Sequence, residues 1–312
     1  MSGSSLDGLD IAYCRVLTSN KYAFQILHAE TIAYPDELKY LLKNTSLQTE
    51  NLHAADKKFG DFCGIAIQSF LQKHKIDTVD FIASHGHTIA HAPEKRFSLQ
   101  IGNAEQMAQR TGLPVVYDFR NADIQAGGQG APLVPICDKM LFPDFNVCLN
   151  IGGIANISYD VEGRQIGYDI CAANQLLNHI AQQLDLTFDT NGAIARSGKS
   201  NNHLLQLLNS DAYFIKTFPK SLDNNYVQNN FISLMNASTL SPSDKLATAT
   251  EHIATQIAES ISRAGISKTQ LQILVTGGGA YNGYLAERIA TLAGIKIQLP
   301  DDTIIQYKEA LA

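Results

Sequence analysis

Two parts of the chain predict the same order of structural elements, and this repetition limits the fold more than any other feature. In the segment 145–170, FNVCLNIGGIANISYDVEGRQIGYDI, three runs with strand character are separated by Gly-Gly and Glu-Gly turns. A predicted helix, NQLLNHIAQQLDL, follows directly. The N-terminal segment begins with the glycine-rich loop SGSSLDG, continues with the predicted strands LDIAYCRVL and YAFQILHAETI, and reaches a helix later. The shared order indicates two structural repeats.

Two such repeats in 312 residues predict an α/β protein of two domains, with mixed sheets flanked by helices. We place the domains at 1–134 and 135–312. The first repeat lacks the strand that opens the second, so we interpret SGSSLDG as the tip of a hairpin whose first arm is absent from this chain. A start annotated too late and a real loss of the strand both remain open.

Hydrophobic spacing and capping residues predict the remaining elements. Phe59, Phe62, Ala66 and Phe70 recur at intervals of three and four, which indicates an amphipathic helix over 53–74. Asn103 and Gly112 bound a second helix, and Asn282 caps a helix that begins after it. Further predictions are a buried strand within 77–86, a strand over 113–119, a long helix over 245–264, a strand within 271–279 and a last strand over 295–299.

Composition excludes several classes of function. The formal net charge is −6 and the 24 basic residues form no cluster, which argues against nucleic acid or an anionic membrane as partner. No apolar stretch approaches the roughly 18 residues that a membrane span needs, and the polar start does not resemble a signal peptide. Five scattered cysteines without a CxxC pair fit a reducing compartment, so we expect a cytoplasmic protein.

The loop SGSSLDGLD predicts an anion site. Glycine lets backbone N–H groups approach an anion closely, and serine hydroxyls add donors. Asp7 could hold Mg²⁺ directly or through water. The loop does not match the pattern GxxxxGK[ST], so a P-loop fold is not expected. A plain surface turn is the alternative interpretation.

Two further glycine turns, NIGGIANIS and VTGGGAYN, extend this hypothesis. Because NIGGIANIS occupies the position in its repeat that SGSSLDG occupies in the first, we expect both loops to face one cleft. The hypothesis is a nucleotide between two domains, with phosphates held by both hairpins and adenosine near the third turn. By itself, NIGGIANIS is also compatible with an ordinary hairpin.

The run YDFRNADIQAGGQGAPLVP is predicted to be a functional loop. Arg120 could bind a carboxylate or a phosphate through two parallel hydrogen bonds, or it could form a structural ion pair with a neighbouring aspartate such as Asp118 or Asp123. In SHGHTIAH, the three histidines have the spacing H-x-H-x3-H without a nearby carboxylate or thiolate. Contacts to a sugar, satisfied loop histidines and a zinc site are the three interpretations.

Asp169, in GYDICAAN, is placed by the pattern at the end of an apolar strand and before a helix. A carboxylate at the C-terminal end of a strand beside a cleft is a reasonable general base. The alternative interpretation is that Asp169 only caps the following helix.

Taken together, these segments resemble the anhydro-N-acetylmuramic acid kinases, a family of the actin-like/Hsp70/hexokinase superfamily. The resemblance covers nearly the whole chain and is most specific in YDFRNADIQAGGQGAPLVP. It implies a two-domain actin-like ATPase (duplicated ribonuclease H-like) fold with a central cleft, an ATP-dependent sugar kinase in peptidoglycan recycling, and a possible homodimer. The implied substrate is 1,6-anhydro-N-acetylmuramic acid, which water must open at C1 while O6 takes the γ-phosphoryl group.

The resemblance also implies roles for individual residues. Asp169 matches the catalytic aspartate, and Mg²⁺ accompanies ATP, with Asp7 as the candidate ligand. The implied ATP-binding residues are Gly3, Ser4, Ser5, Leu6, Asp7, Gly8, Leu9, Asp10, Gly152, Gly153, Gly277, Gly278 and Gly279. The implied sugar-binding residues are His85, Arg120, Asp123, Asn174 and Glu309.

Four features depart from the family pattern. Asp169 is followed by Ile-Cys-Ala-Ala-Asn instead of Thr-Gly-Pro-Gly/Ala-Asn. The loop that usually reads Lys-Ser-Thr-Gly-Arg/Lys-Glu is KSLDNNY, so that only Lys220 and Ser221 match. His87 replaces a glutamine, and the first strand and the last helix are missing. A kinase for another amino sugar and a non-catalytic nucleotide-binding module are therefore the competing hypotheses.

Overall fold

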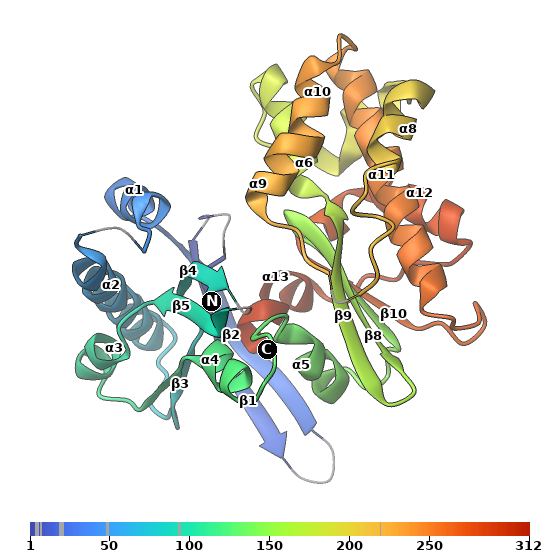
Figure 1. Cartoon of the computed structure of the whole chain (residues 1–312). Helices are drawn as coiled ribbons and strands as arrows, with labels where there is room; N and C mark the ends of the chain where they lie inside the picture. Colours follow the sequence, from blue (N-terminus) through green and yellow to red (C-terminus); the bar gives the residue numbers. More distant parts are fainter. Residues whose placement is uncertain (4–5, 7, 19–21, 48–49, 93–94, 219) are drawn as a thin grey trace. The chain divides into compact units, whose positions relative to one another are not determined.

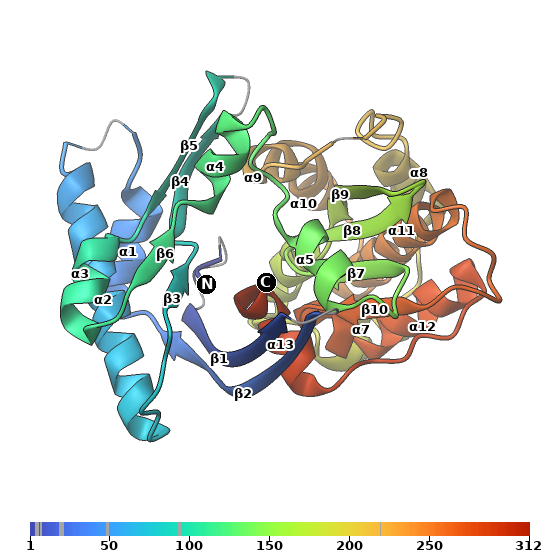
Figure 2. The same ribbon diagram turned by 90° about the horizontal axis from the view of Figure 1, so that it is seen from below.

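The structure, a computed structural model, describes residues 1–3, 6, 8–18, 22–47, 50–92, 95–218 and 220–312. The chain forms two compact units (Figures 1 and 2). The first unit contains residues 1–133 together with 309–312, and the second contains residues 134–308. The α/β class is confirmed, because both units combine strands with packed helices.

In the first unit, strands pair two by two beside helices. Its elements are β1 (Gly8–Thr18), β2 (Tyr22–Ala33), α1 (Asp36–Asn44), α2 (Leu52–Lys73), β3 (Ile82–Ser84), β4 (His87–Ala92), β5 (Phe97–Ile101), α3 (Ala104–Thr111), β6 (Val115–Tyr117) and α4 (Phe119–Gln125). Among the described residues, β1 pairs with β2 and β4 with β5 antiparallel, while β3 pairs with β6 in parallel. Figure 1 shows β1 and β2 as a long ribbon.

The packing of α2 on α3 confirms the amphipathic helix predicted over 53–74. Phe59, Ala66 and Phe70 are buried. Gly60 and Gly64 allow the close approach, since a Cβ on Gly60 would lie 2.6 Å from the backbone nitrogen of Asn103. The predicted caps of α3 are also confirmed: the Asn103 side chain accepts the N–H of Gln106 at 3.0 Å, and Gly112 ends the helix at a φ of 72°.

The first residues of the chain pair with the start of β1. Ser2 forms an antiparallel bridge with Leu9, and the N–H of Asp10 donates to the carbonyl of Met1 at 2.9 Å. Met1 and Ser2 thus pair with Asp10 and Leu9 as residues in the two arms of a hairpin do. The hairpin tip itself stays a prediction, because Ser4, Ser5 and Asp7 lie outside the described residues.

Three local predictions in the first unit were wrong. The strand within 77–86 exists as β3, but its residues are only half-buried or exposed, because β3 pairs with the short strand β6 alone among the described residues. Residues 119–125, predicted as loop, form the helix α4 with the buried residue Ile124 on its inner face. His87 and His91, considered as loop histidines, lie on β4, whose pairing with β5 the sequence pattern did not reveal.

The second unit is built on one four-stranded sheet. Its strands are β7 (Val147–Ile151), β8 (Ile154–Val161), β9 (Arg164–Ala172) and β10 (Ile273–Thr276). Its helices are α5 (Val134–Leu141), α6 (Asn174–Ala181), α7 (Ala193–Ser197), α8 (Asn202–Asn209), α9 (Asn224–Tyr226), α10 (Ser233–Ala237), α11 (Pro242–Arg263), α12 (Gly283–Ala293) and α13 (Asp302–Leu311). The last three residues of α13 belong to the first unit. Short 3₁₀ turns (Gln182–Leu184, Thr190–Gly192, Gly278–Tyr281) and a π-helical turn (Val227–Ile232) complete it.

The strand order is β10-β7-β8-β9, with β10 parallel to β7 and the other neighbours antiparallel. This confirms the predicted strand–turn–strand–turn–strand meander. The long helix α11 contacts α6, α7, α8, α12 and β9, as Figure 1 shows for α6 and α8. Ile157 and Tyr159 of β8 enter the core that α11 helps to form. Ser158, which lies between them in β8, bonds to α5, so helices cover both faces of this sheet.

A buried ion pair joins α13 to α5. Lys308 and Asp138 are 3% and 5% exposed, and Lys308 Nζ lies 3.1 Å from Asp138 Oδ1. The other carboxylate oxygen of Asp138 accepts the hydroxyl of Ser158 at 2.7 Å. Both oxygens of this buried carboxylate are therefore hydrogen-bonded, which is the condition under which a buried charge is tolerated.

The strand predicted over 295–299 is absent, since these described residues have no strand partner. Ile295 and Ile297 nevertheless pack against the core of the unit. The alternating pattern thus identified the inward side chains correctly, but a strand also needs a backbone partner, which the pattern cannot supply. Among the described residues, no helix is long and apolar enough to cross a membrane.

Candidate active site

The two glycine turns of the second unit lie against each other. A Cβ on Gly277 would lie 2.6 Å from Asn150 Oδ1, and one on Gly279 would lie 2.3 Å from a side-chain carbon of Ile151. Gly277 also has a φ of 81°, so its conformation and its surroundings both require glycine. The segment 277–279 therefore touches the end of β7, immediately before the turn at Gly152 and Gly153.

Asn174, a predicted sugar residue, belongs to the same cluster. Its backbone N–H donates to the carbonyl of Gly152 at 3.1 Å, and its side chain donates to the carbonyl of Ile151 at 3.3 Å. The side-chain nitrogen also lies 3.7 Å from where a Cβ on Gly278 would be. Among the described residues, no acceptor takes the backbone N–H of Gly152 or Gly153. These two donors are available to an anion.

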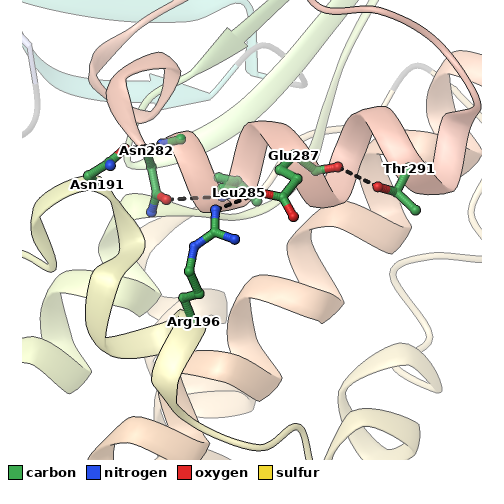
Figure 3. Close-up of polar contacts among 7 residues, drawn as sticks. Asn191, Arg196, Asn282, Leu285, Glu287 and Thr291 are labelled. Atoms are coloured by element: carbon green, nitrogen blue, oxygen red, sulfur yellow. Dashed lines mark hydrogen bonds and ion pairs between the residues drawn. The ribbon is translucent and has the colours of Figure 1, made fainter.

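The motif FDTNGAIARSGK, residues 188–199, supports the helix that follows the third glycine turn. Asn282 caps α12 by accepting the N–H of Leu285 at 3.0 Å, which confirms the predicted cap. Asn191 accepts the N–H of Gly283 at 2.9 Å, and Arg196 pairs with Glu287 at 2.6 Å (Figure 3). This motif therefore holds the start of α12, directly after residues 277–279.

Asp169 lies within β9, which continues to Ala172, so the prediction that it ends the strand was wrong. Its Oδ2 accepts the backbone N–H of Leu222 at 2.9 Å. Among the described residues, nothing bonds to Oδ1. The register of β8 and β9 shifts beside Asp169, because Asn156 faces Asp169 while Ala155 faces Cys171. Such a bulge locally bends a strand and redirects a side chain, and bulges are frequent next to active sites.

The surroundings of Asp169 suit a proton acceptor. Burial raises the pKa of the carboxyl group, and the hydrogen bond from the Leu222 N–H partly opposes this rise. A raised pKa makes the carboxylate a stronger base than an exposed aspartate. The capping alternative is excluded, because the N-cap of α6 is Ala173 and has no side-chain cap bond.

The predicted phosphate loop of the first unit is described in part. Ser4, Ser5 and Asp7 lie outside the described residues. Leu9 is buried in the core of this unit, and Leu6 packs against it, so neither side chain is a ligand group. Position 8 has room only for glycine, since a Cβ there would lie 2.7 Å from the carbonyl oxygen of Ile32. The roles of Gly3 and Asp10 stay predictions; Asp10 Oδ1 accepts the hydroxyl of Thr31 at 2.6 Å.

Arg120 and His85, both predicted to bind sugar, are hydrogen-bonded to each other. Arg120 Nε donates to His85 Nε2 at 3.0 Å, and Nη1 donates to the carbonyl of Gly130 at 2.8 Å. Burial, followed by the charge of Arg120, lowers the pKa of His85 to about 4, so the ring is neutral at neutral pH. Within the described part of the chain, Arg120 forms no ion pair, with Asp118 and Asp123 included, and its Nη2 has no partner there.

Asp123 holds the loop that carries Gly130 through a hydrogen bond. Its carboxylate accepts the N–H of Gly130 at 2.7 Å, so this residue and Arg120 fix the two sides of the same glycine. Glu309 lies on the exposed side of α13 and belongs to the first unit. The sugar-binding roles of Asp123 and Glu309 stay predictions. His87 and His91 bond to Ser2 and Ser98 respectively, and no group of three metal-binding side chains occurs among the described residues.

A cavity of about 640 Å³ lies within the first unit, and His85 lines it. Polar groups from several elements share its wall, among them Glu105, Asp118 and Asn121. Gln100 also lines it, and its Oε1 is a buried acceptor without a partner among the described residues. A ligand with several hydroxyl or amide donors suits this wall better than an apolar one.

The comparisons with known proteins identify the family. The family model for anhydro-N-acetylmuramic acid kinase matches residues 1–312. The chain belongs to the anhydro-N-acetylmuramic acid kinase family. Proteins of that name from Pseudomonas syringae pv. syringae (strain B728a) and Sulfurovum sp. (strain NBC37-1) are 37% and 36% identical to it. The alignments cover 97% of this chain in both cases, and 84% and 86% of those proteins.

Among solved structures, component A of (R)-2-hydroxyglutaryl-CoA dehydratase from Acidaminococcus fermentans is similar over 96% of this chain and 95% of its own, with a TM-score of 0.44 at 14% identity. This likeness is too weak to carry an argument. Family membership itself confirms the predicted kinase class, a phosphotransferase acting on an alcohol group of a small-molecule sugar with ATP as donor. It contradicts the hypothesis of a non-catalytic module.

The sequence did not predict the contacts that surround Asp169. Leu222, Tyr213 and Lys220 all reach it from 44 to 53 residues away. The only sequence signal for these contacts was the match of Lys220 and Ser221 to a loop of the kinase family. That match identified the segment but not the residues that the segment contacts.

Proposed function

We propose that the protein converts 1,6-anhydro-N-acetylmuramic acid, ATP and water to N-acetylmuramic acid 6-phosphate and ADP, in peptidoglycan recycling. The observation that carries this proposal is the Asp169 carboxylate. It is half-buried on β9, held through one oxygen by the Leu222 N–H, and unpaired at the other oxygen among the described residues. A member of this kinase family needs such a base to activate water.

The proposed reaction couples two bond exchanges. Asp169 removes a proton from water as the water oxygen bonds to C1 of the sugar and the C1–O6 bond breaks. O6 then accepts the γ-phosphoryl group of ATP, and the bond to ADP breaks. Because the anhydro sugar has no free 6-hydroxyl, phosphoryl transfer to O6 requires this ring opening. The carboxylate therefore acts on water and not on the nucleotide.

We propose that the backbone donors of Gly152 and Gly153 bind ATP phosphates, together with the loop Gly3–Asp10, and that residues 277–279 approach the nucleoside. Mg²⁺ prefers oxygen ligands and is usually held by one or two carboxylates plus phosphate oxygens. Asp7, which lies outside the described residues, is the proposed ligand. Asp10, at the start of β1, adds a carboxylate whose Oδ1 accepts the Thr31 hydroxyl, and this type of oxygen donor fits the ion. When bound, Mg²⁺ neutralises phosphate charge.

For the sugar, we propose the polar cavity of the first unit with His85, the unpaired guanidinium nitrogen of Arg120, and Asp123, Asn174 and Glu309. Neutral His85 accepts a hydrogen bond from Arg120 and so orients it toward an anionic group. We further propose that the two units are actin-like lobes, that the protein acts in the cytoplasm as a homodimer, and that it binds neither nucleic acid nor membranes.

The decisive experiment incubates the protein with ATP, Mg²⁺ and the anhydro sugar in ¹⁸O-labelled water and analyses the sugar phosphate by mass spectrometry. One ¹⁸O at C1 and phosphate on O6 are expected. A product without ¹⁸O would refute activation of water by Asp169.

A panel of other amino sugars tests the second candidate, a kinase for a related substrate. The observation that favours it is the fully buried Cys171-Ala172-Ala173, which replaces the flexible Gly-Pro-Gly/Ala of the family next to Asp169. Faster turnover of another amino sugar than of the anhydro sugar would establish that candidate.

A further inference from the structure

Residues Tyr213, Lys220 and Leu222 contact Asp169 at three points. The Tyr213 hydroxyl donates to the backbone carbonyl of Asp169 at 2.5 Å. The backbone N–H of Asp169 donates to the carbonyl of Lys220 at 3.3 Å. Leu222 N–H holds the carboxylate itself at 2.9 Å. A segment distant in sequence therefore binds the main chain and the side chain of one residue.

The side chain of Lys220 contacts both Tyr213 and the residue before Asp169. Its Nζ lies 4.4 Å from the ring centroid of Tyr213 and 5.5 Å from that of Tyr168, the residue before Asp169. The same ammonium group donates to the carbonyl of Tyr213 at 3.3 Å. Cation–π contacts of a partly desolvated ammonium group stabilise such an arrangement. Lys220 thus lies over the ring of Tyr213, whose hydroxyl bonds to Asp169, and over the ring of Tyr168, which precedes Asp169 in the strand.

In this arrangement the two carboxylate oxygens of Asp169 differ in their hydrogen bonding. Oδ2 is fixed by the Leu222 N–H, whereas Oδ1 has no partner among the described residues. A base that must meet a water molecule needs one free oxygen in a fixed direction, because misplacement by about 1 Å can reduce turnover about 100-fold.

We propose that Tyr213 and Lys220 are positioning residues for Asp169: they hold the chain so that Leu222 keeps one carboxylate oxygen and leaves the other for water. This inference rests on the proposed function of Asp169 as the base. Neither residue touches the reacting atoms in this mechanism. Their contribution is to hold the segment from which the Leu222 N–H fixes one carboxylate oxygen of Asp169.

The test compares Tyr213→Phe and Lys220→Met with a matched control. Tyr213→Phe removes only the hydroxyl that bonds to Asp169, and Lys220→Met removes the ammonium group while keeping a side chain of similar length. Lys216→Met is the control, because the exposed Lys216 also lies over the Tyr213 ring, at 5.7 Å, but has no described contact with Asp169. Lys220→Arg retains a cation above both rings and should restore the parent behaviour.

We expect Tyr213→Phe and Lys220→Met to lower kcat about 10-fold or more with little change in the KM values for ATP and sugar. We also expect the acid limb of the kcat–pH profile to move to higher pH. The reason is that the Leu222 N–H bond lowers the pKa of Asp169, so a weaker bond leaves the rise caused by burial less opposed. A purely structural role would lower the melting temperature without moving this limb.

Unchanged kcat and an unmoved acid limb in both variants would overturn the inference, as would equal effects in Lys216→Met or a failure of Lys220→Arg to restore the profile. Asp169→Asn, measured in parallel, separates this result from the proposed function. If Asp169→Asn retains parent activity, the role of Asp169 itself fails. If it is inactive while the other variants match the parent, only the positioning role fails.

Discussion

The buried pair of Asp138 and Lys308 allows a quantitative prediction about the second unit. Lys308→Met would leave the Asp138 carboxylate buried, with the Ser158 hydroxyl as its remaining described hydrogen bond. Removal of one partner of a buried ion pair costs about 3–5 kcal/mol, because the other charge stays desolvated. For a unit of this size, each kcal/mol corresponds to about 2–4 °C, so the melting temperature should fall by about 6–20 °C.

The structure supplies a matched control and a rescue. Lys139→Met breaks the pair with Asp160, whose side chains are 43% and 41% exposed, and should cost far less stability than Lys308→Met because water screens an exposed pair. Replacing Asp138, Ser158 and Lys308 together by Leu, Ala and Met removes both charges and the hydroxyl that bonds to Asp138. This triple variant should recover most of the lost stability, since apolar groups of similar volume can replace a buried pair without net cost.

Denaturant unfolding followed by far-UV circular dichroism measures these differences, and tyrosine emission is a second probe because the chain contains no tryptophan. A Lys308→Met variant no less stable than Lys139→Met would refute the reasoning. A triple variant less stable than Lys308→Met would also refute it, because the cost would then not come from an uncompensated charge.

Three further predictions concern catalysis and the glycine turns. Asp169→Asn should reduce turnover by about 10²–10⁴ while ATP affinity, measured by calorimetry, stays near the parent value, because the carboxylate acts on water; a large loss of ATP affinity would contradict this. In the parent, kcat should fall as the pH drops through the raised pKa of Asp169. The midpoint of the acid limb of the kcat–pH profile should therefore lie above the pKa of about 4 that is usual for aspartate. A midpoint at or below that value would count against Asp169 as the base. Gly277→Ala should destabilise the protein and weaken ATP binding. Gly163→Ala should cost only the backbone strain of its φ of 85°, about 1 kcal/mol, since nothing lies within 4 Å of the added Cβ. An equal loss of stability in the two variants would show that crowding at Gly277 does not matter.

The sequence predicted the catalytic candidate but not the residues that hold it in place. The position of Asp169 between an apolar strand and a helix was enough to nominate it as a base. Its function in the structure depends on Tyr213, Lys220 and Leu222, whose contacts span 44 to 53 residues. The sequence also nominated Arg120, but it did not show that His85 is the partner that holds it, 35 residues away. Such pairs have no local pattern, so only the folded chain reveals them.

The sequence by itself determined the features that depend on neighbouring residues. The caps at Asn103 and Asn282, the glycine that ends α3 and the three-stranded meander all follow from backbone conformation and hydrogen bonding within a few residues. Tertiary structure alone decided that residues 295–299 pack without becoming a strand, that 119–125 form a helix, and that the Lys308 ammonium is buried beside Asp138. These outcomes depend on which distant backbone or charge is available as a partner, and that availability arises only when the chain has folded.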